Sequence, residues 1–291
     1  MFDFRYHVAS LAAVFVALVI GILVGVGVSS NDTLSHSERK LLNEQYAEVR
    51  AERDTVIAQL NALQDQERAA SAFSSLAYPV VMGDRLKGKR VGIVFVGPSD
   101  ARVRGLIEGT LTDSGGLSTR FRALKVPVDP AAIEQAISSR PALAAKYAGP
   151  AGLEKLGKEL GSELVKGGKA PLWGPLSKLL VVERSGGMTG PLDGVVLVRT
   201  ATPQHGPTVG FLRGFYAGLG SAGAPLVGVE TSDAKVSAMP IFRQLGISSV
   251  DDLQTAAGRL ALAALLAGAP SGHYGLDQSV DAGVLPPLSG G

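Results

Sequence analysis

The chain of 291 residues contains no cysteine. This absence excludes disulfide bridges, thiolate metal sites, iron–sulfur clusters and cysteine nucleophiles, and it fits either side of a membrane. Methionine is also scarce, with four in the chain including the initiator. A soft copper site built from thioether ligands would need Met82, Met188 and Met239 to converge, and nothing in the sequence requires that convergence.

The chain has no large excess of charge of either sign. Its 28 basic and 26 acidic side chains leave a formal charge of +2, so nucleic acid is not an expected partner. Catalytic signatures are missing too, since the sequence holds no G-x-S-x-G, no H-E-x-x-H and no P-loop. In the turn Val96-Gly97-Pro98-Ser99-Asp100 one glycine stands where a dinucleotide site has three, and Asp100 fits a helix cap instead. We therefore predict a protein that is not an enzyme and has no catalytic cofactor.

A long uncharged segment runs from Val8 to Ser29 and contains 22 residues. As a helix with a rise of about 1.5 Å per residue it would extend about 33 Å, which is enough to cross the hydrocarbon core of a bilayer. The segment is longer than the usual apolar core of a signal peptide, although small residues at 27–30 leave cleavage as an alternative. We predict a short N-terminal tail at 1–7 and a single transmembrane helix at 8–29.

Small residues recur at every fourth position of this segment. Placed on a helix they form one stripe: Ala9, Ala13, Ala17, Gly21, Gly25 and Ser29. Small side chains let two helix backbones approach closely inside a membrane. We therefore predict that the stripe is a helix–helix interface and that the protein forms a homodimer or a higher homo-oligomer.

The next region has no glycine between Val28 and Met82, and its first proline is Pro79. This composition predicts a helical stalk over 31–77. Apolar residues recur in it every seven positions, which is the spacing of a coiled-coil seam: Leu42, Val49, Val56 and Leu63. The companion seam is interrupted by Arg53. Self-association of the stalk is the favoured interpretation, and a single amphipathic helix lying against its own head domain is the alternative.

Beyond the stalk, frequent glycine and proline predict a head domain over 85–283 and a flexible tail over 284–291. Two strand–helix–strand units have the length of parallel crossovers, and they cover 91–96, 103–111 and 119–126, then 194–198, 211–219 and 225–230. Helices broken at Pro141 and Pro150 lie between them, and a last helix is expected over 251–267. The fold class is therefore α/β, with a Rossmann-like head on a mainly parallel sheet. Close packing on that sheet is expected for Gly210, Gly214 and Gly218.

The four histidines of the chain form no pair at the spacing of metal ligands. His205 lies in a loop between two prolines, and His273 lies in the segment Gly272-His273-Tyr274-Gly275. Both are turn-like settings in which histidine tolerates unusual backbone angles. Together with Met239 these histidines are weak candidates for metal ligands, and each is more simply a loop or core residue.

Two segments near the ends of the chain have a recognisable pattern. The first is Phe4-Arg5-Tyr6-His7-Val8-Ala9-Ser10-Leu11, which leads into Gly21 and Gly25, and the second comprises Val250-Asp251-Asp252, Gly258-Arg259 and Gly272-His273-Tyr274-Gly275. Read together, they resemble the MctB family of actinobacterial copper-transport, channel-forming envelope proteins. The order of anchor, stalk and head is similar over nearly the full length. A similar corynebacterial envelope protein, SteB, is implicated with a membrane partner in controlling cell-wall hydrolysis during division.

The resemblance implies a single-pass protein of the cell membrane, with its amino terminus inside and most of the chain extracytoplasmic. It also implies copper efflux or copper homeostasis, with copper as the metal. The residues themselves favour a structural or regulatory envelope protein that presents its head to a partner. The similarity to SteB implies that this partner controls cell-wall remodelling or division. Both hypotheses include self-association through span and stalk, and one helix cannot enclose a pore, so transport would require several copies.

Overall fold

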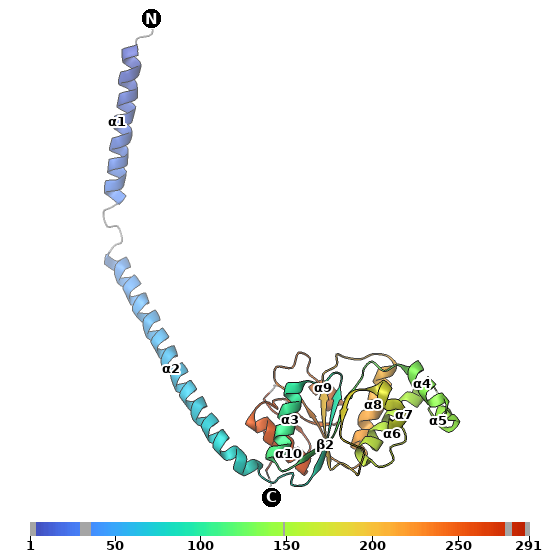
Figure 1. Ribbon diagram of the computed structural model, residues 1–291. Helices are drawn as coiled ribbons and strands as arrows, with labels where there is room; N and C mark the ends of the chain where they lie inside the picture. Colours follow the sequence, from blue (N-terminus) through green and yellow to red (C-terminus); the bar gives the residue numbers. More distant parts are fainter. Residues whose placement is uncertain (1–3, 30–35, 148, 277–280, 289–291) are drawn as a thin grey trace. The chain divides into compact units, whose positions relative to one another are not determined.

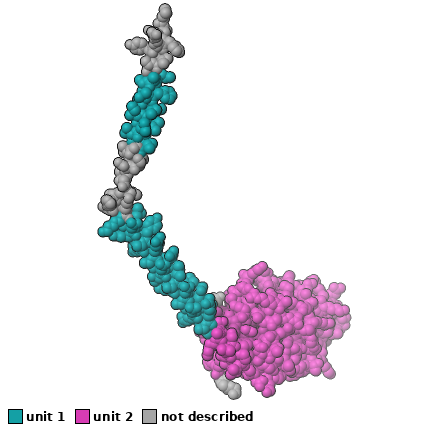
Figure 2. Space-filling view, turned by 60° about the vertical axis from the view of Figure 1, so that its left-hand side comes forward, with its two compact units in different colours: residues 1–70 teal, residues 71–291 magenta. Residues whose placement is uncertain are grey.

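The computed structural model describes residues 4–29, 36–147, 149–276 and 281–288. The chain divides into two compact units, residues 1–70 and residues 71–291 (Figure 2). The first unit is helical, and the second contains both helices and a sheet.

The N-terminal helices are α1 (Phe4–Ser29), with 26 residues, and α2 (His36–Met82), with 47 residues. The segments predicted as span and stalk are therefore helical wherever the structure describes them. Among the described residues, none of the helices has both the length and the apolar character that crossing a membrane requires. Passage of 8–29 through a membrane accordingly stays a prediction. The helix α2 continues through Pro79, and its last residues, 71–82, belong to the second unit.

The second unit is built on a seven-stranded sheet with the order β3-β2-β1-β4-β5-β6-β7. Its strands are β1 (Arg90–Val96), β2 (Leu117–Leu124), β3 (Val181–Ser185), β4 (Gly194–Arg199), β5 (Leu226–Val229), β6 (Ser248–Val250) and β7 (His273–Tyr274). Neighbouring strands are parallel except for β2 and β3, which are antiparallel. This arrangement confirms an α/β fold on a mainly parallel sheet.

Helices cover both faces of the sheet. They are α3 (Ala101–Asp113), α4 (Pro130–Ser138), α5 (Pro141–Lys146), α6 (Pro150–Lys166), α7 (Trp173–Leu180), α8 (Pro207–Gly220), α9 (Met239–Gln244) and α10 (Ala256–Ala267). Figure 1 shows α3 and α10 on one side of the sheet and α6, α7 and α8 on the other. The predicted breaks are confirmed, because Pro141 begins α5 and Pro150 begins α6.

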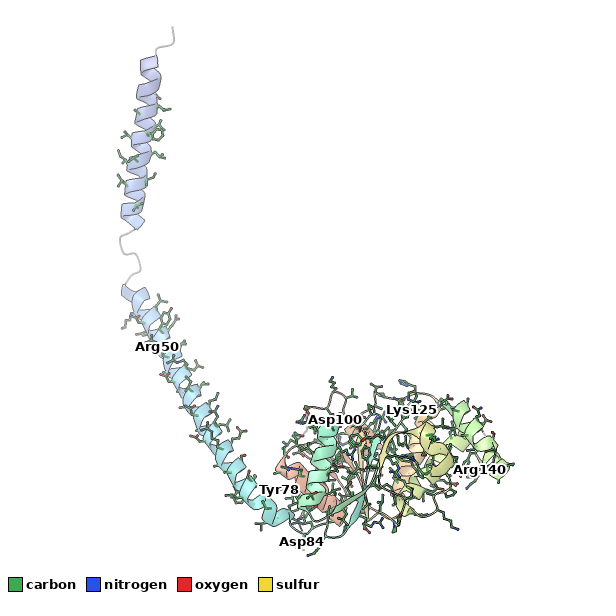
Figure 3. All side chains as sticks on the ribbon, viewed as in Figure 1. Arg50, Tyr78, Asp84, Asp100, Lys125 and Arg140 are labelled. Carbon is green, nitrogen blue, oxygen red and sulfur yellow. The ribbon has the colours of Figure 1, made fainter. Side chains whose placement is uncertain are left out.

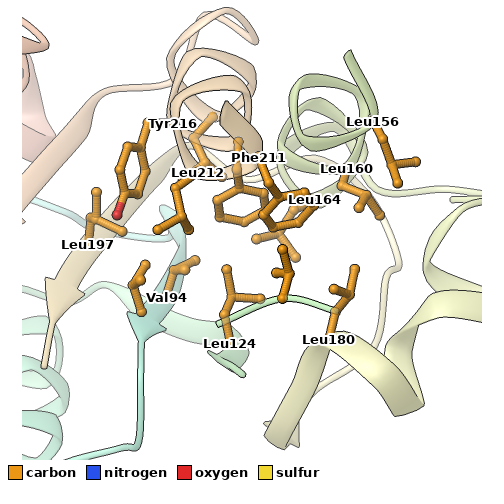
Figure 4. Packing of buried hydrophobic residues seen from close by; sticks show 14 of the residues in the cluster. Val94, Leu124, Leu156, Leu160, Leu164, Leu180, Leu197, Phe211, Leu212 and Tyr216 are labelled. Carbon is orange, nitrogen blue, oxygen red and sulfur yellow. The ribbon is translucent and has the colours of Figure 1, made fainter. Parts of the chain in front are cut away.

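Two hydrophobic cores lie on the two faces. Successive side chains of a strand point to opposite faces, so Ile93 and Phe95 of β1 join one core while Val94 and Val96 join the other. Figure 4 shows the second core, in which Val94 lies near helical side chains such as Leu212. Burial on both faces explains why β1 is a continuous apolar run in the sequence.

The glycines of α8 correct one prediction, because they approach a helix rather than the sheet. A Cβ added to Gly214 would collide with the carbonyl oxygen of Glu154, and one added to Gly218 with that of Lys158, both on α6. Gly210 has open space around it. The contact is reciprocal, since two glycines of α6 approach the backbone of α8 in the same way: Gly157 and Gly161. The two helix backbones therefore touch along one side.

The start of the last helix is also corrected. It was expected at Asp251, but α10 begins at Ala256, and Thr255 is its N-cap, with its hydroxyl accepting from Gly258 N at 2.9 Å. A threonine in extended conformation is a preferred cap, and the two aspartates before it lie in the loop after β6. Residues 284–288 of the predicted tail form no helix or strand.

Candidate functional site

Ligand sites in open α/β sheets gather at the carboxyl ends of the strands. At the end of β1, Asp100 accepts from Arg102 N at 2.9 Å and from Val103 N at 3.0 Å. This confirms Asp100 as the N-cap of α3. The hydroxyl of Thr200, just after β4, donates to Pro98 O at 2.6 Å and links the segments that follow the two strands. The amides at this helix start are thus satisfied by the protein itself.

Two buried acids hold loops at the carboxyl ends of β5 and β6. The carboxylate of Glu230 accepts from Ser237 Oγ and from Ala238 N, each at 2.6 Å. The carboxylate of Asp251 accepts from Leu276 N at 3.0 Å. Both side chains therefore fix loop segments by hydrogen bonds, Glu230 the segment before α9 and Asp251 the segment after β7. Their positions in the sequence did not predict this role.

Asp252 is the most enclosed acid of this edge, with 0% of its surface exposed. Its Oδ2 accepts from Thr255 Oγ1 at 2.8 Å, whereas its Oδ1 has no hydrogen-bond partner among the described residues. Burial raises the pKa of this carboxyl, and the neighbouring Asp251 raises it further. Asp252 therefore retains a proton more readily than an exposed aspartate.

The three metal-ligand candidates have separate settings. Met239 is 3% exposed and belongs to the core beneath α8 and α9. His273 is half-buried, its Nδ1 lies 2.8 Å from Ser249 Oγ, and burial lowers its pKa. His205 is exposed in the loop before α8. Within the described ranges, no group of three or more histidine, aspartate or glutamate side chains is arranged to hold a metal ion.

The methionines do not converge either. Met82 lies in the core beneath α3 and α10, whereas Met239 lies in the core on the other face of the sheet. The sulfur of Met188 lies 3.5 Å from the guanidinium of Arg122. A copper site that used all three thioethers would therefore need a different arrangement of the head.

The predicted coiled-coil seam is open to solvent in the single chain. The exposed fractions are 44% for Leu42, 62% for Val49, 52% for Val56 and 65% for Leu63. Apolar side chains exposed in a row along a helix are typical of a surface that a partner covers.

The small-residue stripe of α1 is equally open. A Cβ added at Gly21 or Gly25 would meet nothing within 4 Å, and Ala13 and Ala17 are exposed. The side chains of two further members of the stripe lie outside the described residues: Ala9 and Ser29.

The end of α2 contains a contact that the sequence did not reveal. Tyr78 lies in the last turns of α2 (Figure 3). Within the second unit, its hydroxyl donates to Asp113 Oδ2 at 3.0 Å, and the guanidinium of Arg259 lies 4.8 Å from its ring centroid. Burial is the main cause that raises the pKa of Tyr78 to about 12. Because Met82 is fully buried, the last turns of α2 are part of the head.

Two buried arginines of β2 were also missed. Arg120 and Arg122 are 2% and 5% exposed, and backbone carbonyls accept most of their hydrogen bonds. Arg120 donates to the carbonyls of Leu164, Gly187 and Gly190, which ties β2 to the end of α6 and to the loop after β3. Burial is the main cause that lowers the pKa of Arg120 to about 10. Arginine in a strand gave no signal of burial.

These observations define a protein in which long N-terminal helices precede a mixed α/β head. The family model described as "Copper transport outer membrane protein, MctB" matches residues 1–285, and the chain belongs to this family. Similar curated proteins are the copper transporters MctB of two Mycobacterium tuberculosis strains, CDC 1551 and H37Rv, and of Mycobacterium bovis. Each is 31% identical over 129 residues, which cover 42% of this chain and 39% of the relative. The alignment therefore spans well under half of the relatives' length.

Proposed function

We propose that this chain is a membrane-anchored protein of the cell envelope that takes part in copper efflux or copper homeostasis. The family match over residues 1–285 carries this proposal, because it includes both the N-terminal helices and the head. The uncharged segment 8–29 supports a single-pass anchor, with most of the chain outside the cytoplasm.

The mechanism we propose is self-association through α1 and α2. A single helix cannot enclose a path for an ion, so a transport role needs several copies. The exposed seam of α2 and the open glycine stripe of α1 support such contacts between copies. The head would then be held at the membrane by the associated helices.

A copper titration of the full chain in nanodiscs tests the copper part of the proposal. We expect Cu(I) to bind in competition with a chelator of known affinity, and we expect the variant His205→Ala, which removes the exposed histidine of the head, to bind it more weakly. The matched control is His36→Ala, at the start of α2. Absence of binding at physiological free copper would remove direct metal handling.

A second function is favoured by a separate surface on the last turns of α2. Phe73, Leu76 and Val80 are 73%, 79% and 82% exposed, and they share one helix face at the spacing i, i+3, i+7. This patch supports a structural or regulatory protein that presents its head to an envelope partner in cell-wall remodelling or division.

Crosslinking in intact membranes followed by purification distinguishes the two functions. A partner that is lost in a Leu76→Glu variant but kept in a Ser75→Glu variant supports presentation of the head. Recovery of the chain alone, in both wild type and variants, counts against a partner-presenting role.

A further inference from the structure

A groove runs between α8 and α9 on one face of the head. The part of it between the two helices is a cavity of about 180 Å³. A cavity of about 580 Å³ continues it toward the starts of β5 and β6, and the two share Arg213, Tyr216 and Leu245 as walls. The smaller cavity is closed by Arg199, the last residue of β4, and by the loop that follows it. The groove thus begins at the carboxyl edge of the parallel sheet, where α/β folds place their ligands.

Among the residues that the structure describes, every charged side chain that lines either cavity is an arginine, namely Arg199 or Arg213. Arg199 is half-buried, and it donates from Nη1 to Tyr216 Oη at 3.3 Å and from Nη2 to Thr202 O at 3.2 Å. Among the described residues, no carboxylate lies within salt-bridge distance of Arg199. Its positive charge is therefore held in place by uncharged acceptors alone.

The second arginine is only loosely paired. Nη1 of Arg213 lies 3.7 Å from Glu154 Oε2, and its side chain is 59% exposed. An exposed ion pair at this distance contributes little, about 0–1 kcal/mol, so the guanidinium can turn toward the groove at small cost.

The buried Tyr216 adds a donor to the same place. Its hydroxyl accepts from Arg199, and within the described part of the chain its own proton has no hydrogen-bond acceptor. The other walls of the smaller cavity are mainly apolar, with Gln204 and Gln244 among them. Two of the apolar side chains are exposed at the rim: Val209 at 38% and Leu245 at 37%. The smaller cavity thus combines cationic donors with apolar walls.

We propose that the groove between α8 and α9 binds a small amphipathic anion. Its carboxylate or phosphate group would take hydrogen bonds from Arg199, Arg213 and Tyr216, and its apolar body would lie along Leu245. A guanidinium is suited to this role because it offers several N–H donors in one plane to the oxygens of a carboxylate or a phosphate. This site is independent of copper handling.

Calorimetric titration of the full chain in nanodiscs with hexanoate, hexyl phosphate and inorganic phosphate tests the proposal. We expect hexanoate or hexyl phosphate to bind, and whichever binds more tightly identifies the anionic group. Inorganic phosphate should bind more weakly than hexyl phosphate because it makes no contact with the apolar walls. Hexyltrimethylammonium should not bind.

Two arginine variants locate the site. Arg199→Gln and Arg213→Gln should each weaken binding about 10-fold or more, since each removes charge-assisted hydrogen bonds to the anion. The emission of the single tryptophan, Trp173, reports whether the head of each variant stays folded. The matched control is Arg243→Gln on α9, because Arg243 lines neither cavity.

A third variant tests the apolar wall, since Leu245→Asp places a negative charge at an exposed rim position and should abolish anion binding. Unchanged affinity in both arginine variants would overturn the proposal. Equal binding of hexyltrimethylammonium would also overturn the proposal. So would a failure of both hexyl anions to bind at about 10 mM ligand, which is roughly the weakest affinity that can be assigned to a specific site.

Discussion

Individual buried polar residues fix the loops of this head. Arg120 and Arg122 hold backbone carbonyls with their guanidinium groups, and Glu230 holds the segment before α9. Each of these side chains forms hydrogen bonds with backbone groups that would otherwise be buried without partners. Leaving such groups unpaired would raise the free energy of the folded state. The function of such residues is therefore structural, and their loss should be measured as a change in stability.

Replacing Arg120 by methionine should lower the free energy of unfolding by about 2 kcal/mol or more, because it leaves carbonyl groups of the loop after β3 without a donor. Urea unfolding of the full chain in mild detergent, followed by Trp173 emission, measures this change. The matched control is Arg140→Met, since Arg140 is exposed and donates one bond of 3.4 Å to Pro171 O. A loss for Arg140→Met as large as for Arg120→Met would contradict the assignment.

The pairing of His273 with Ser249 should make the head sensitive to acid. Burial lowers the pKa of His273 below that of an unfolded histidine, so the unfolded state takes up the proton first as the pH falls. The contribution of His273 to stability is thus present above the unfolded pKa and is lost as the pH falls through the folded pKa.

Unfolding midpoints of wild type and His273→Gln at pH 7.5 and pH 5 test this sign. We expect the advantage of the wild type over the variant to shrink at the lower pH. The matched control is His205→Gln, because that side chain is exposed in the folded protein. A wild-type advantage that grows on acidification would show that the charged imidazole is the stabilising form.

At the scale of elements, the closest pair in the head is α6 with α8. Glycines on both helices let the backbones touch, so this contact leaves no room for even a methyl group. The same helix α8 also carries Gly210, where a methyl group would meet nothing. One helix therefore offers both a test position and its control.

Gly214→Ala should destabilise the head by about 1–3 kcal/mol, because the added methyl group forces α8 away from α6. Gly210→Ala should be neutral or stabilising by up to about 1 kcal/mol, since alanine favours a helix. Thermal unfolding of both variants measures the difference. Equal midpoints for the two variants would mean that α6 and α8 separate easily.

The seam of α2 can be tested by disulfide trapping, because the chain has no cysteine of its own. In a parallel two-stranded coiled coil, a seam position lies close to its counterpart and a position two residues away lies on the opposite side of the helix. We expect Val56→Cys to form a covalent dimer on mild oxidation and Ala58→Cys to remain monomeric. Similar yields of covalent dimer at both positions would indicate that the disulfides form by random collision of chains and would contradict the seam.

Much of this element pattern could be predicted from the sequence, and the exceptions have physical causes. Apolar runs bounded by glycine and proline revealed β1, β4, β5 and the helices that begin at Pro141 and Pro150. The short strands β6 and β7 have three and two residues, too few for a period to show. The strand β3 was missed because it is an exposed edge with polar residues. The arginines of the groove were missed because only folding brings β4, α8 and α9 together.

At the scale of the whole molecule, the N-terminal helices and the head carry different candidate functional surfaces. Membership of the MctB family covers both units, whereas the candidate contacts between copies lie in the first unit and the candidate anion groove in the second. Attachment to a membrane can therefore be tested without disturbing the head.

The full chain should remain in the membrane pellet after extraction at alkaline pH, because an apolar helix of about 20 residues is held by the hydrocarbon core. A Leu18→Arg, Ile22→Arg variant should be released, since each arginine costs about 2.5–3.5 kcal/mol near the bilayer centre. Immunoblotting of pellet and supernatant measures the difference. The control, Gln59→Arg, changes charge only on the exposed stalk. Release of the wild type would refute the anchor.

The interlocked backbones of α6 and α8 have a consequence for ligand selectivity. One wall of the candidate anion groove is rigid, because α8 cannot shift without breaking its fit to α6. The opposite wall is α9, a helix of six residues whose Met239 and Phe242 are buried in the core. Since the interior of the head fixes both walls, the width of the groove would select ligands by the thickness of their apolar part.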